Sequence, residues 1–162
     1  MKSAKATTTT KVVLITGASS GFGRATASLF AKHGYRIFGT SRNSKDMNPI
    51  GYELLSLDVR SDESVRACVD TVLELTGRID ILINNAGVNT MRHRVPIDQF
   101  PRDEWDRIVQ IDLTGLYVVS RIVADAMRTQ KWGRIVNISS VAGLVPLRLQ
   151  CAFVAAKAGV IN

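Results

Sequence analysis

The sequence predicts an α/β protein in which a doubly wound parallel sheet carries helices on both of its faces. Short apolar runs rich in β-branched residues alternate along the 162 residues with segments whose apolar residues recur at helical spacing. A glycine-rich loop also separates the first apolar run from the first helical segment. No internal repeat or low-complexity linker divides the chain, so a single domain is expected.

The first two predicted elements are a strand at residues 11–16 (KVVLIT) and a helix at residues 22–33. The strand is apolar and β-branched, and it stops at Gly17, as a buried strand does at a turn. Gly34 follows the helix and provides its C-terminal stop. The apolar face expected for this helix consists of Phe22, Ala25 and Leu29.

Two further strands are predicted at residues 35–40 (YRIFGT) and 52–59 (YELLSLDV). An amphipathic helix follows at residues 62–75, with Ser61 as its N-cap. A fourth strand at residues 79–84 (IDILIN) is almost continuously apolar, as expected for a strand that is covered on both faces. The apolar side of the helix comprises Val65, Val69, Val72 and Leu73.

The last predicted elements are a long helical region at residues 100–129 and a fifth strand at residues 133–139 (GRIVNIS). Residues 1–10 are polar and rich in threonine, and we expect them to form a disordered tail. The folded domain is therefore predicted to cover residues 11–162.

Composition and charge argue against several classes of function. No apolar run approaches the roughly 18 residues of a membrane span, so no membrane partner is expected. The net charge is +7, but charges of both signs are mixed along the predicted helices, which favours solvated faces over a nucleic-acid site. Cys68 and Cys151 match no metal or redox spacing, so we expect no metal site and reduced thiols in the cytoplasm.

The glycine-rich loop TGASSGFG at residues 16–23 predicts a dinucleotide site. Its glycines permit a tight turn and a close approach to a pyrophosphate, while the N-terminus of the following helix favours an anion. Glycines also serve ordinary strand-to-helix turns, but this loop follows a strand and opens a helix, as a phosphate-binding loop does. The candidate cofactor-binding residues are Gly17, Ser19, Ser20, Gly21, Phe22 and Gly23.

The end of the second predicted strand indicates which dinucleotide is bound. A site for NAD places an acid here on the ribose 2′-hydroxyl, whereas this chain has Thr40, Ser41 and Arg42. An arginine binds a 2′-phosphate bidentately, and a carboxylate would repel it. We therefore expect NADP rather than NAD, bound by Ser41 and Arg42; the alternative is that Arg42 is a solvated loop residue. The first 45 residues, which carry lysines and arginines but no acid, agree with this choice.

Further motifs follow this loop in a fixed order. Asp58 and Val59 end the third predicted strand, NNAG stands at residues 84–87, and GRIVNISSVAG stands at residues 133–143. Together with TGxxxGxG, they resemble the classical short-chain dehydrogenase/reductase family over nearly the whole chain. The resemblance implies a Rossmann-like sheet of strand order 3-2-1-4-5, a small carbonyl or alcohol substrate, and a homo-oligomer through the long helical region. It also implies cofactor contacts by Asp58, Val59, Asn85, Ala86 and Gly87.

The resemblance also assigns the catalytic positions. In the family, a serine polarises the substrate carbonyl and a tyrosine thirteen residues later passes the proton. A lysine four residues further on binds the nicotinamide ribose and lowers the pKa of the tyrosine. The corresponding residues here are Ser140, Phe153 and Lys157, so the aromatic ring is present without its hydroxyl.

Two other features depart from the family's pattern. Asp112 stands where the family usually has an asparagine of its proton relay; a buried carboxylate there would need a proton or a partner such as Lys157. A helix residue with a local partner is the alternative interpretation of Asp112. Family members also continue with two more strands, so the resemblance implies a domain incomplete at its C-terminus, without the last strands and with its fifth strand at a sheet edge.

Two classes of function follow from these patterns. The first is an NADP(H)-dependent oxidoreductase of carbonyl or alcohol substrates whose chemistry is impaired by Phe153 and by truncation. A positioned general acid alone contributes about 10²–10⁴-fold to the rate. The second is a non-catalytic NADP-binding or assembly protein, or an inactive fragment, that keeps the cofactor site.

Overall fold

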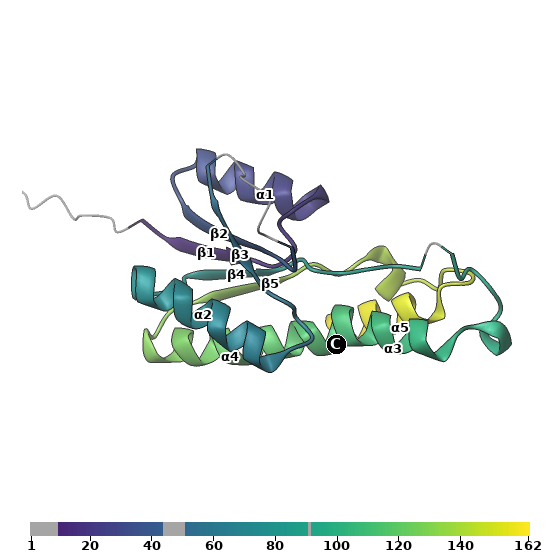
Figure 1. The fold of residues 1–162 in the computed structure, drawn as a ribbon. Coiled ribbons are helices and arrows are strands. Elements are labelled where there is room, and N and C mark those ends of the chain that lie inside the picture. The colour runs from purple at the N-terminus through teal and green to yellow at the C-terminus, as the bar shows by residue number, and fades with distance from the viewer. Residues whose placement is uncertain (1–9, 44–50, 91) are drawn as a thin grey trace, which may run out of the picture.

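The computed structural model describes residues 10–43, 51–90 and 92–162, and its sheet has five parallel strands (Figure 1). The strands are β1 Val12–Ile15, β2 Arg36–Ser41, β3 Glu53–Ser56, β4 Ile81–Asn84 and β5 Arg134–Asn137. Their order is β3-β2-β1-β4-β5, which confirms the predicted doubly wound sheet. Residues 1–9 of the predicted tail lie outside the described residues.

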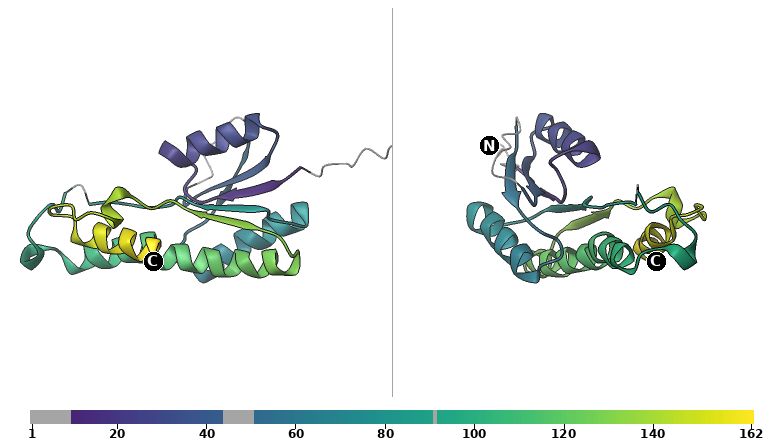
Figure 2. Two further views of the ribbon diagram at one scale, coloured as in Figure 1. Left: turned by 180° about the vertical axis from the view of Figure 1, so that it is seen from behind. Right: turned by 45° about the vertical axis from the view of Figure 1, so that its right-hand side comes forward.

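Helices cover both faces of the sheet (Figures 1 and 2). One face carries α1 Gly21–Lys32, and the opposite face carries α2 Asp62–Thr76 and α4 Gly115–Thr129. Two more helices, α3 Arg102–Val109 and α5 Cys151–Ile161, pack against each other. None of the helices in the described residues combines the length and the apolar content of a membrane span.

Strand β1 lies at the centre of the core because both of its faces are apolar. Val12 and Leu14 belong to the cluster that packs against α2 and α4, whereas Val13 and Ile15 belong to the cluster beneath α1. This division follows from the alternation of side chains along a strand. Burying each such side chain contributes roughly 1.5–3 kcal/mol to stability.

The predicted apolar face of α1 is wrong. Phe22 and Leu29 are 84% and 53% exposed, and Ala25 is exposed as well. The buried residues of this helix are instead Gly23 and Ala27. A Cβ on Gly23 would lie 2.3 Å from a backbone oxygen of the preceding loop. Because the helix lies so close to that loop, only small residues fit on its buried face, and the larger apolar residues Phe22 and Leu29 lie on the exposed face.

The long helical region predicted at residues 100–129 contains an irregular turn. Helices α3 and α4 are joined by η2 Gln110–Thr114, which is a π-helical turn. Such a turn accommodates an extra residue within a helix and is frequent at functional sites. Asp112 lies in this turn and is 1% exposed. Two short 3₁₀ turns complete the secondary structure, η1 Ile97–Gln99 and η3 Val141–Gly143.

Helix α2 confirms the features predicted from its sequence. The side-chain oxygen of Ser61 accepts a hydrogen bond from the N–H of Ser64 at 3.1 Å, so Ser61 is the N-cap. An N-cap of this kind contributes about 1 kcal/mol to helix stability. The predicted apolar side is buried or half-buried against the sheet: Val65, Val69, Val72 and Leu73.

Strand β5 lies at one edge of the sheet. Within the described residues it pairs only with β4, and all four of its residues are exposed. Ile135 and Val136 are 39% and 45% exposed. The expectation that the fifth strand forms a sheet edge is thus confirmed for this chain.

Candidate functional site

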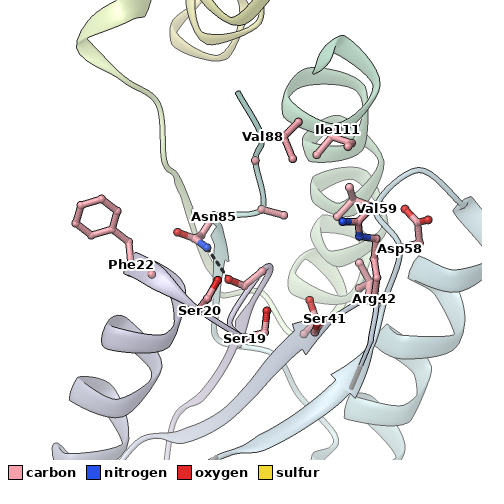
Figure 3. Close-up of a pocket in the computed structure, with 16 residues that line it drawn as sticks. Ser19, Ser20, Phe22, Ser41, Arg42, Asp58, Val59, Asn85, Val88 and Ile111 are labelled. Atoms are coloured by element: carbon pink, nitrogen blue, oxygen red, sulfur yellow. Dashed lines mark hydrogen bonds between the residues drawn. The ribbon is translucent and has the colours of Figure 1, made fainter. Parts of the chain in front are cut away.

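A cavity of about 410 Å³ opens at the carboxyl ends of the strands (Figure 3). It is lined by residues 17, 19–22, 40–42, 57–59, 85–88 and 111, which come from four separate loops and from the π-helical turn. Apart from Gly23 and Lys157, all of the predicted cofactor-binding residues line this cavity. The structure therefore brings together residues that are as much as 94 positions apart in sequence, from Gly17 to Ile111.

The glycine loop forms the floor of the cavity where it enters α1. Gly17 and Gly21 have φ values of +67° and +53°, which glycine adopts readily. A Cβ on Gly17 would lie 2.9 Å from the Cα of Ala86, and a Cβ on Gly23 would lie 2.5 Å from Nδ2 of Asn85. Gly23 does not touch the cavity, but it allows α1 to begin close beneath it.

The first turn of α1 has the features of an anion-binding site. Ser20 is its N-cap residue, but no side chain among the described residues caps the helix, and its first turn contains no acid. The N–H groups of the first turn and the positive end of the helix dipole are therefore directed at the cavity without a negative partner from the protein. A phosphate group is the kind of ligand that this arrangement favours.

Hydrogen bonds from Asn85 connect the glycine loop to the end of β4. Its Nδ2 donates hydrogen bonds to the carbonyl oxygens of Thr16 and Gly17 at 2.9 and 3.0 Å. In return, the hydroxyl oxygen of Thr16 accepts hydrogen bonds from the N–H groups of Asn85 and Ala86 at 3.0 and 2.9 Å. Asn85 thus shapes the loop as well as lining the cavity. Sequence reasoning missed the role of Thr16, although this threonine is the first residue of the TGASSGFG loop.

Arg42 and Asp58 lie on one side of the cavity, opposite Phe22 (Figure 3). The guanidinium of Arg60 binds the Asp58 carboxylate through two side-chain nitrogens, with an Nη2–Oδ2 distance of 2.6 Å. This hydrogen bonding to Arg60 lowers the pKa of Asp58 below its usual value. Arg60 therefore offsets the negative charge of Asp58, so the acid does not cancel the positive potential that Arg42 provides here.

The predicted catalytic residues lie outside the lining of the cavity. Nζ of Lys157 is 3.2 Å from Oδ2 of Asp112, and it donates a hydrogen bond to the carbonyl oxygen of Ile138 at 3.2 Å. The ring of Phe153 lies 5.7 Å from this Nζ. The oxygen of Ser140 accepts a hydrogen bond from the N–H of Ala142 at 3.1 Å and caps η3. The structure thus places Asp112, Phe153 and Lys157 together.

Asp112 is held within the protein by hydrogen bonding and by charge. Its Oδ1 accepts a hydrogen bond from the N–H of Val88 at 2.7 Å. Its Oδ2 has the ammonium of Lys157 as an ionic neighbour, but it makes no well-aligned hydrogen bond with any described residue. Burial raises the pKa of the Asp112 carboxyl, against the opposing effects of the Val88 N–H and the Lys157 ammonium. The pairing with Lys157 expected from the sequence is confirmed.

Phe153 contributes a hydrocarbon ring and no proton. It packs against a small cluster formed by Ile108, Ala152 and Ala156. A phenylalanine satisfies this cluster as well as a tyrosine would, because the cluster requires only apolar contact. The sequence did not reveal four cavity-lining residues, namely Thr40, Leu57, Val88 and Ile111, since apolar and small side chains at loop ends carry no distinctive pattern. The described residues contain no cluster of His, Cys, Asp and Glu that would hold a metal ion.

Comparisons with known proteins agree with this geometry. The family described as short chain dehydrogenase matches residues 11–162. The 3-oxoacyl-[acyl-carrier-protein] reductase FabG of Vibrio harveyi is 38% identical over 158 residues, which cover 94% of this chain and 64% of that protein.

Two solved structures have the same fold. The NAD+-bound xylitol dehydrogenase matches with a TM-score of 0.87 and 33% identity, over 93% of this chain and 61% of that one. A tyrosine-to-phenylalanine variant of ElxO with NADPH bound matches with a TM-score of 0.86 and 27% identity, over 94% of this chain and 64% of that one. The chain therefore spans a little under two thirds of the length of these proteins.

Proposed function

The chain belongs to the short-chain dehydrogenase family, and we propose that it is an NADP(H)-dependent oxidoreductase of carbonyl or alcohol substrates whose proton transfer is impaired. One observation carries the proposal: the cavity joins an uncapped helix N-terminus to a cationic side chain, Arg42. The pyrophosphate would lie over the glycine loop and the 2′-phosphate beside Ser41 and Arg42. The nicotinamide would then supply a hydride to the substrate carbon.

The choice of NADP over NAD rests on the charges at the β2 end of the cavity. Ser41 and Arg42 line it there, and the only carboxylate of the described lining is that of Asp58, which Arg60 binds. The 2′-phosphate of NADP(H) carries close to two negative charges near neutral pH. The Arg42 guanidinium therefore favours binding of a dinucleotide that has this phosphate. Family neighbours bind either cofactor, as the NAD+-bound xylitol dehydrogenase and the NADPH-bound ElxO variant illustrate.

Phe153 limits what the chain itself contributes to carbonyl reduction. The oxygen that gains negative charge needs a proton, and the side chain at this position has none to donate. Loss of a positioned general acid lowers a rate by about 10²–10⁴-fold. Ser140 would still orient a carbonyl, and water or Lys157 would be the remaining proton source. Binding of the cofactor does not require the phenol, because the cavity lining does not include Phe153.

The cavity, taken together with Phe153, also favours a second candidate function, that of a non-catalytic NADP-binding or assembly protein. Most of the predicted cofactor-binding residues line one cavity, which supports binding of a dinucleotide, whereas Phe153 carries no hydroxyl that could donate a proton. The ElxO variant, in which a phenylalanine replaces a tyrosine and NADPH is bound, supports the idea that such a substitution is compatible with cofactor binding. A cytoplasmic location, which the free thiols of Cys68 and Cys151 support, and a homo-oligomer through α4 remain predictions.

Titration of the purified chain with NADPH and NADH tests the proposal. We expect NADPH to bind at least about tenfold more tightly than NADH, and Arg42→Ala to remove most of that preference, because a charge-assisted contact to phosphate is lost. Arg66→Ala serves as a matched control, since Arg66 is exposed on α2 and outside the cavity lining. Equal affinity for the two nucleotides would contradict the NADP assignment.

A panel of small carbonyls and alcohols, supplied with NADPH or NADP, separates the two candidate functions. Slow but measurable turnover by the wild-type chain supports the impaired oxidoreductase. Cofactor binding without any turnover above the uncatalysed rate supports the non-catalytic protein. If neither nucleotide binds, both candidates fail.

A further inference from the structure

The outer edge of β5 exposes a row of apolar side chains. All four residues of the strand are exposed, Ile135 and Val136 among them. The opposite edge of the sheet differs, because Leu54 and Leu55 of β3 are half-buried. Exposed apolar patches of this kind mark interaction sites. Beyond the strand, the row of exposed apolar residues continues through Ile138, Val141, Leu144 and Val145.

Backbone groups of β5 point outward from the same edge. The N–H groups of Arg134 and Ile138 donate hydrogen bonds to carbonyl oxygens of the β4 segment, each at 2.9 Å. Because backbone groups alternate in direction along a strand, those of Ile135 and Asn137 point away from β4. Among the described residues β5 pairs only with β4, so the outward groups have no strand partner there. Edge groups of this kind are a template for pairing with another strand.

A second copy of the strand matches this edge in an antiparallel register centred on Val136. Pairing about a twofold axis places Val136 opposite the Val136 of the second copy, and Ile135 opposite its Asn137. The residues whose backbone groups point outward then form the hydrogen-bonded pairs, and each such pair exchanges both of its N–H···O bonds. Val136 forms the pair without backbone hydrogen bonds, in which the two side chains lie closest to each other.

The charges of β5 also suit this register. Arg134 is the only charged residue of the strand, and it would lie opposite the Ile138 of the second copy. The two arginines are then at opposite ends of the interface, whereas a register centred on Arg134 would place them directly opposite each other, which is destabilising. A twofold pairing is also closed, because each copy contributes the same β5 edge and no further copy can add to it.

We propose that two copies of this chain pair through β5 as antiparallel strands, so that the dimer has one continuous sheet. Antiparallel pairing brings the end of one β5 beside the start of the other. Ile138 and the exposed segment after it then lie near the groove that Trp132 and Ile135 line in the second copy, which extends the apolar contact. This interface is distinct from the homo-oligomer predicted through α4, and it does not depend on the cofactor.

Charge variants at Val136 test the interface and its register by analytical ultracentrifugation. We expect the wild-type chain to be a dimer at about 100 µM. Val136→Lys and Val136→Glu are each expected to be monomers, because like charges would face each other across the twofold axis. An equimolar mixture of the two variants should restore the dimer, which a merely misfolded variant would not do. Tyr117→Lys is the matched control, since Tyr117 is an exposed residue of α4, and we expect it to remain a dimer.

A wild-type chain that stays monomeric at about 100 µM would overturn the proposal and leave the β5 edge to a different partner. A dimer that Tyr117→Lys disrupts and Val136→Lys does not would overturn it as well, because the interface would then lie on α4. Should the Val136 variants fail to fold, Ile135→Pro replaces them, since the N–H that it removes points away from β4. Ser56→Pro, at an exposed position on the β3 edge, is its control. A dimer that survives both proline variants equally would contradict pairing through β5.

Discussion

At the residue scale, the side chain of Phe153 differs from that of a tyrosine by one hydroxyl group, and the proposed loss of proton transfer depends on that group. Phe153 keeps the apolar contacts of its position, since it packs on Ile108, Ala152 and Ala156. It also keeps a ring 5.7 Å from the Lys157 ammonium. A phenylalanine at this position therefore keeps the packing, which depends on the ring, while the proposed proton transfer would depend on the hydroxyl that it lacks.

Phe153→Tyr is expected to raise the turnover of NADPH-dependent carbonyl reduction by about 10²–10⁴-fold, because it supplies the missing general acid. Initial rates at saturating cofactor measure this effect. Phe100→Tyr is a matched control, because Phe100 contacts the same apolar cluster and lies outside the family's catalytic pattern. Wild-type turnover equal to that of Phe153→Tyr would show that another group already donates the proton.

Around the cavity, the sequence predicts which residues come together but not how their side chains pair. The glycine loop, Arg42 and Asp58 could be placed at one site because each stands at the carboxyl end of a predicted strand, and such ends meet at one edge of a parallel sheet. That Arg60 binds the Asp58 carboxylate could not be predicted in this way. The contact depends on the path of the backbone between two neighbouring side chains, which no periodic pattern encodes.

At the element scale, short apolar runs bounded by turns predicted all five strands. The run that forms β1 is apolar throughout because this strand is buried on both faces. The π-helical turn η2 and the buried face of α1 were not predictable. The buried face of α1 depends on close contact with a segment distant in sequence, since a Cβ on Gly23 would lie 2.5 Å from Nδ2 of Asn85. The pairing of Asp112 with Lys157 was foreseen from charge alone, but its position in a π turn was not.

Helix α3 carries an ion pair whose effect on stability depends on pH. Glu104 is mostly buried, and its carboxylate accepts hydrogen bonds from two nitrogens of Arg107 at 2.6 and 2.9 Å. These hydrogen bonds lower the pKa of Glu104 below the ordinary value of 4.5. Because the folded-state pKa is the lower one, the stabilisation is complete above the ordinary value and is lost as the pH falls through the folded-state pKa.

Glu104→Gln is therefore expected to reduce the free energy of unfolding by about 1–2 kcal/mol at pH 7, with the difference shrinking below pH 4.5. Urea unfolding at a series of pH values measures both quantities. Asp106→Asn is the control, since its partner pair with Arg102 is exposed and should contribute less than about 0.5 kcal/mol. Parallel pH profiles for wild type and Glu104→Gln would contradict this account of Glu104.

At the scale of the whole molecule, the strand order itself creates the cavity. Strands β1 and β4 are neighbours, but the chain leaves β1 toward α1 on one face and leaves β4 toward α3 and α4, with α4 on the other face (Figure 1). The two connections diverge, so a crevice remains above the carboxyl ends of these strands. The glycine loop and the Asn85 segment are the walls of this crevice, and Asn85 hydrogen-bonds one to the other.

The central claim is that the backbone amides at the start of α1 bind the phosphates of NADP(H), and amide resonances of the isotopically labelled chain test it most directly. Addition of NADPH is predicted to shift and protect the amides of residues 19–23, which lie in the loop and the first turn of α1. Gly23→Ala should abolish this response, because its Cβ would lie 2.3 Å from the Gly17 carbonyl oxygen. Saturable NADPH binding that leaves those amides unchanged would contradict the claim.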